Sequence, residues 1–104
     1  MVAVDLNSMR KLVDEARAAE AYDQLLTARR RLLGESAPLT LAAWGSFAYW
    51  RGKAGDAAGA ADAFAELLEL MARVLGDKHP HIQIIRYNLA HWRSEAGKRG
   101  STGG

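Results

Sequence analysis

The chain has 104 residues, of which 49% are hydrophobic and 25% charged, and its formal net charge is +2. This length suits one domain with a continuous core, and the composition is typical of a soluble globular protein. The absence of cysteine excludes disulfides, thiolate metal sites and a cysteine nucleophile, and the small, scattered charge disfavours nucleic-acid binding.

Alanine, leucine and arginine dominate the chain and long β-branched runs are absent, so we expect an all-α fold. The first two helices are expected near residues 8–33 and 38–54, because apolar residues recur there at spacings of three and four. These residues are Ala18, Tyr22, Leu25, Leu26 and Leu33, followed by Ala43, Phe47, Trp50 and Ala54. Whether the first helix is continuous through Val13 stays open, since the glycine found at positions 55 and 97 is absent there.

The next two helices are expected near residues 56–75 and 80–96. Asp56 is a plausible N-cap, Gly76 suits the left-handed residue that ends a helix, and Pro80 fits the first turn of the following one. Short connections make consecutive helices antiparallel. The last helix is expected to end at Gly97, and the polar, glycine-rich tail 98–104 is expected to be disordered.

The chain repeats itself with a period of 42 residues. When residues 14–55 are placed on residues 56–97 without a gap, 16 of the 42 positions are identical. The matches include the pairs Gly34/Gly76, Pro38/Pro80, Trp50/Trp92 and Gly55/Gly97. Matches of tryptophan, proline and glycine are hard to reach by chance, so the sequence indicates two tandem copies of a helix pair.

The second copy resembles the 42-residue tetratricopeptide repeats of kinesin light chains, and more closely their bacterial relatives, which are common in actinobacterial repeat proteins. The resemblance rests on Gly76-Asp77-Lys78-His79-Pro80, on Arg86-Tyr87-Asn88-Leu89-Ala90 and on Trp92-Arg93-Ser94-Glu95-Ala96-Gly97. It implies a short α-α superhelix of antiparallel hairpins over residues 1–97, with repeat units 14–55 and 56–97. The first copy departs from the family pattern at residues 35–38 and 44–48.

The resemblance also implies a binding surface, because such repeats hold peptides or partner domains on a concave face. Carried over by position, the candidate contact residues are Gly45, Ser46, Tyr49 and Lys53 in one copy and Tyr87, Asn88, His91 and Glu95 in the other. Asn88 is the strongest candidate, since the family uses that asparagine against peptide backbone. A clamped C-terminal carboxylate is disfavoured, because the lysine and asparagine that form such a clamp are absent from the matching positions.

Other distinctive residues have ordinary structural interpretations. Trp50 and Trp92 lie on the apolar stripes and are expected in the core. The histidines at 79, 81 and 91 lack the four ligands of structural zinc, and capping is the preferred role for the pair beside Pro80. The arginines at 29–31 complement a helix dipole as readily as they would bind phosphate. No serine lies in a nucleophile elbow and no glycine loop precedes a helix, so we expect no catalysis, metal or cofactor.

The last helix is the first half of a repeat whose second half does not follow. Its apolar rim, Ile82, Ile84, Ile85, Leu89 and Trp92, is therefore expected to be partly exposed, and homo-oligomerisation through this helix is one prediction. The leading hypothesis is a non-catalytic module that binds a peptide or partner protein; the alternative is a self-assembling structural module. Residues 1–10 resemble neither a signal peptide nor a membrane span, so we expect a cytoplasmic protein that does not bind membranes.

Overall fold

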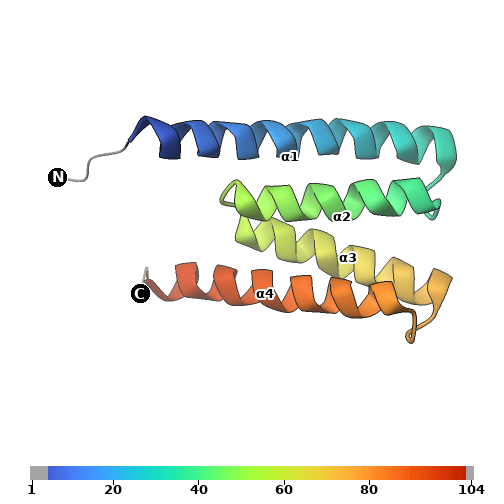
Figure 1. Cartoon of the computed structure of the whole chain (residues 1–104). Helices are drawn as coiled ribbons and strands as arrows, with labels where there is room; N and C mark the ends of the chain where they lie inside the picture. Colours follow the sequence, from blue (N-terminus) through green and yellow to red (C-terminus); the bar gives the residue numbers. More distant parts are fainter. Residues whose placement is uncertain (1–4, 103–104) are drawn as a thin grey trace.

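The computed structural model describes residues 5–102, with side chains described up to residue 98, and this part of the chain is all-α, as expected. Its helices are α1 (Leu6–Leu33), α2 (Pro38–Lys53), α3 (Ala57–Leu75) and α4 (Pro80–Thr102) (Figure 1). None of these helices combines the length and the apolar character that crossing a membrane requires.

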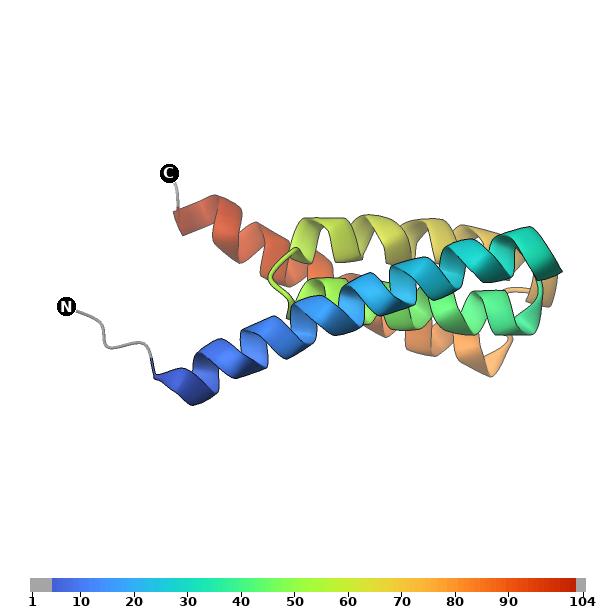
Figure 2. The same ribbon diagram turned by 90° about the horizontal axis from the view of Figure 1, so that it is seen from above.

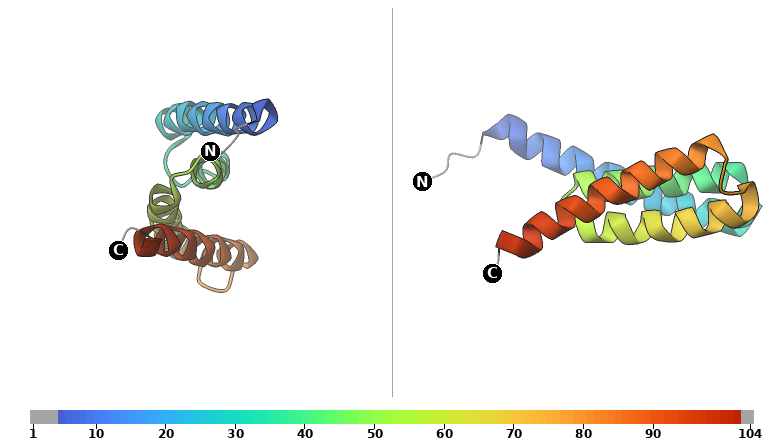
Figure 3. Two further views of the ribbon diagram at one scale, coloured as in Figure 1. Left: turned by 90° about the vertical axis from the view of Figure 1, so that its left-hand side faces the viewer. Right: turned by 90° about the horizontal axis from the view of Figure 1, so that it is seen from below.

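The helices pack in chain order. α1 lies against α2, α2 against α3 and α3 against α4, with a lighter contact between α2 and α4. Viewed end on, they follow one another from α1 to α4 (Figure 3). Because each connection reverses the chain direction, α2 and α4 are parallel and begin at the same end of the molecule.

The structure shows why the helices end where they do, and the pattern repeats after 42 residues. Gly34 and Gly76 have φ angles of 89° and 87°, in the left-handed region that favours glycine. Their N–H groups donate to the carbonyls of Arg30 and Ala72, which closes α1 and α3. Pro38 and Pro80 begin the helices that follow, as predicted.

The connection between α1 and α2 is held by polar contacts. The Thr40 hydroxyl donates to the Gly34 carbonyl at 2.7 Å, and Arg29 Nη1 donates to the Leu39 carbonyl at 2.8 Å. The guanidinium of Arg30 lies 4.4 Å from the centre of a Trp44 ring, a cation–π contact. Two of the three consecutive arginines therefore have structural roles within the fold.

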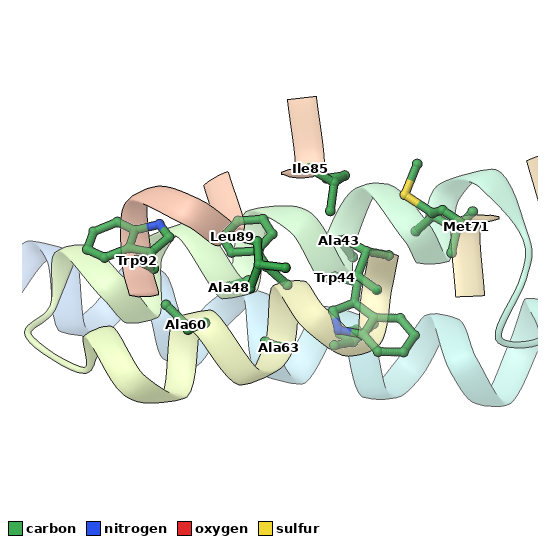
Figure 4. Packing of buried hydrophobic residues seen from close by; sticks show 14 of the residues in the cluster. Ala43, Trp44, Ala48, Ala60, Ala63, Met71, Ile85, Leu89 and Trp92 are labelled. Atoms are coloured by element: carbon green, nitrogen blue, oxygen red, sulfur yellow. The ribbon is translucent and has the colours of Figure 1, made fainter. Parts of the chain in front are cut away.

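The core is centred on α3, which is packed between α2 and α4. Phe64 and Leu67 of α3 are almost fully buried, and small residues let the neighbouring helices approach closely. Figure 4 shows an alanine-rich seam, containing Ala48, Ala60 and Ala63, with Trp44 and Trp92 at its two ends. Burial of such apolar surface is the main stabilising term, at about 25 cal/mol per Å².

The structure answers one question that the sequence left open and shows that one predicted helix boundary was wrong. α1 continues without interruption past Val13, because no glycine or proline is present there to end it. α4 continues past Gly97 to Thr102, into the tail that was expected to be disordered, and Gly97 does not adopt a positive φ. A helix-interior glycine costs only about 1 kcal/mol, which does not force an end. The first turns of α1 and the last turns of α4 thus extend beyond α2 and α3 (Figure 2).

The apolar rim of the last helix is mostly buried, contrary to the prediction of partial exposure. Ile82, Ile85, Leu89 and Trp92 all belong to the buried core, and only Ile84 is exposed. Since α3 already covers this rim, the observation that motivated homo-oligomerisation through the C-terminal helix is not found.

Candidate functional site

A groove lies between the two parallel helices α2 and α4, and α3 contributes to its lining. Its volume is about 810 Å³, within the range of about 300–1,000 Å³ typical of ligand sites. Residues from both walls and from α3 give it a largely apolar lining: Leu41, Trp50, Phe64, Met71, Ile84 and Ile85.

Polar side chains in the groove are few. Ser46 and Tyr49 line it from α2 and Asn88 lines it from α4. Asn88 Nδ2 already donates to the Ile84 carbonyl at 2.9 Å, within its own helix. No lysine, arginine, aspartate or glutamate of the described residues lines this groove. The surface therefore suits an apolar ligand with few hydrogen-bonding demands.

The structure brings three of the predicted contact residues, Ser46, Tyr49 and Asn88, into this groove, together with Gly45. It does not bring the other four there. They are distributed over the surface or engaged elsewhere: Lys53, Tyr87, His91 and Glu95.

Each of these four residues has a different position. Lys53 lines a smaller pocket near α1, and Tyr87 is 74% exposed. The His91 ring packs edge-on against Trp92 of its own helix, with the ring centroids 4.6 Å apart. Glu95 forms an exposed ion pair with Lys98 at 3.6 Å. The groove thus includes only part of the surface that the positional transfer suggested.

Sequence reasoning missed several groove residues. Val74 and Leu75 contribute from the end of α3. Ile84, which contributes from α4, was expected in the partly exposed rim of the last helix, and it is 57% exposed.

Trp50 occupies a different position from the other repeated tryptophan. Trp92 is buried, with 6% of its surface exposed, whereas Trp50 is half-buried and lines both the groove and the smaller pocket. The core assignment was therefore correct for Trp92 and only partly correct for Trp50. Trp92 lies against Gly52 of α2 within the core, whereas Trp50 lies between the two hollows.

The histidine pair at the start of α4 has a structural role. His79 Nδ1 accepts a hydrogen bond from the His81 N–H at 3.2 Å, which confirms the capping interpretation. Both histidines also line the groove at this end. Among the described residues, no three His, Cys, Asp or Glu side chains gather where they could hold a metal ion.

The Asp5 carboxylate lies away from the groove, at the start of α1. The Asp5 carboxylate accepts a hydrogen bond from the Ser8 backbone N–H at 2.6 Å, and this contact lowers the pKa of Asp5. It is an N-cap, which satisfies a free amide of the first turn. The shift therefore reflects helix capping.

Comparisons of the chain with protein-family models, with curated proteins and with solved structures give no match. The function therefore has to be inferred from the groove itself.

Proposed function

We propose that the chain is a non-catalytic, cytoplasmic interaction module whose groove between α2 and α4 binds an apolar helical segment of another protein. The observation that carries this proposal is the largely apolar groove of about 810 Å³, left open between two parallel helices. The resemblance to tetratricopeptide repeats supports the same class of function, although the groove supports it without that resemblance.

The chemistry of the walls favours a helix as the bound form. The walls are themselves helices, whose backbone groups bond internally, so they offer no strand edge for an extended peptide. An extended peptide would need side-chain partners for its backbone, and the groove offers few, with Asn88 Nδ2 already donating to Ile84. A helix satisfies its own backbone and presents apolar side chains at i, i+3 and i+7, which is what this lining can accept.

A peptide selection tests the proposal directly. A displayed library of random peptides would be selected on the intact chain, and the enriched sequences would be synthesised and titrated by fluorescence anisotropy. We expect apolar residues at helical spacing, together with a gain of helicity on binding measured by circular dichroism.

Matched variants then locate the binding site. Ile84→Glu places a charge in the groove at a residue that is 57% exposed, so the fold should tolerate it. Leu32→Glu makes the same kind of change on α1, outside the groove, at a residue that is 82% exposed. Peptides that lose affinity only for Ile84→Glu support the proposal, whereas equal binding to both variants, or no enriched helical peptide, contradicts it.

A further inference from the structure

The first turns of α1 carry exposed apolar side chains. Leu6, Met9 and Val13 are 81%, 49% and 49% exposed. Their spacing of three and four residues places them on one face of the helix, which we call the α1 stripe.

The charged residues of the same turns lie on another side of the helix. Arg10, Lys11, Asp14 and Glu15 line the smaller pocket, where α1 passes the end of α2 beside Trp50, and of these four only Glu15 is buried. These turns therefore keep both their charges and their apolar side chains exposed. Exposed apolar side chains gathered on one face of a helix are available to another surface.

The α1 stripe cannot reach the groove of its own chain. α1 is one continuous helix from Leu6 to Leu33, and its first turns extend beyond α2 as a straight projection (Figure 2). Folding these turns back would require breaking the helix. Any groove that the stripe enters must therefore belong to another molecule.

The stripe and the groove match in length and in chemistry. Leu6 to Val13 spans seven helical steps, about 11 Å, and the α4 wall from His81 to Asn88 spans the same seven steps. The stripe has the i, i+3, i+7 pattern of helix-in-groove recognition and contains no charge, as the groove lining contains no carboxylate, lysine or arginine. Two uncovered apolar surfaces on one chain are thus complementary.

We propose that the α1 stripe of one copy docks into the groove between α2 and α4 of a second copy. This inference rests on the proposed function, because it names the helix that the groove binds. The contact is heterologous, since stripe and groove are different surfaces, so either a reciprocal dimer or a longer chain of copies is compatible with it.

The test measures the mass of the intact chain in solution by light scattering coupled to size-exclusion chromatography, over a range of concentrations up to millimolar. The wild-type chain should associate as concentration rises. Met9→Glu removes the stripe and Ile84→Glu blocks the groove, so each variant alone should associate at least about tenfold more weakly. Leu32→Glu, on α1 outside both surfaces, should behave as the wild type.

A mixture of the two variants distinguishes the contact between stripe and groove from any other contact between copies. Met9→Glu keeps an intact groove and Ile84→Glu keeps an intact stripe, so an equimolar mixture should form a one-to-one complex. A wild-type chain that stays monomeric overturns the inference, as does a mixture that fails to associate. If peptides selected on the groove still bind such a monomer, only the inference about the second copy fails; if no helical peptide binds either, the proposed function fails with it.

Discussion

Replacing Gly52 with alanine tests the contact between α2 and α4 that closes one end of the core. A Cβ atom on Gly52 would lie 2.6 Å from Cε2 and Cζ2 of Trp92. Trp92 is itself buried, so its ring has little room to move away. Helix propensity favours alanine by at most about 1 kcal/mol, whereas overpacking a core costs about 1–3 kcal/mol. We expect the overpacking to dominate and the free energy of unfolding to fall by about 1–2 kcal/mol.

Urea denaturation followed by circular dichroism measures this change, and the same helix provides the control. A Cβ on Gly45 would lie 3.8 Å from Leu67 Cδ2, which is ordinary contact, so Gly45→Ala should stabilise the chain by about 0.5–1 kcal/mol. In a Trp92→Phe background the smaller ring leaves room, and Gly52→Ala should cost less. Gly52→Ala at or above wild-type stability would refute the packing of Trp92 on Gly52.

Three further predictions concern the helices. Trp92→Ala should destabilise the chain by about 3–5 kcal/mol, and Trp50→Ala by clearly less because Trp50 is half-buried, as measured by urea denaturation. Gly97→Ala meets no neighbouring atom within 4 Å and should raise stability by up to about 1 kcal/mol and increase the helical circular dichroism signal. The pKa of Asp5 is lower in the folded chain than in the unfolded chain. The stabilisation by this N-cap is therefore fully present above the pKa of the unfolded state and is lost as pH falls through the pKa of the folded state. The protection of the Ser8 amide against exchange, measured by NMR relative to the intrinsic rate at each pH, should fall over that acid range in the wild type and not in Asp5→Asn, whose side chain caps without titrating.

The sequence predicted the helices well because their ends depend on local chemistry. Gly34 and Gly76 end helices through backbone angles that other residues rarely adopt, and Pro38 and Pro80 begin the next ones. These signals act over a few residues and can be read without tertiary knowledge. Gly97 misled the prediction because a glycine ends a helix only when the following chain turns away, and here α4 continues.

The groove could be predicted only in part. Ser46, Tyr49 and Asn88 were found by transferring positions from the repeat family, and Ser46 and Asn88 are equivalent positions of the 42-residue period. The end of α3 was missed because its role depends on how far the helices separate, which residue spacing does not determine.

The parallel arrangement of α2 and α4 gives the groove a direction. Both helices begin at the same end, so their partial positive charges, each about half an elementary charge, add at the Pro38 and Pro80 end, and the partial negative charges add at the other. A helix lying along the groove is therefore favoured when its own dipole opposes those of the walls. The groove thus favours one polarity of an incoming helix over the reverse, even where its apolar contacts would accept both.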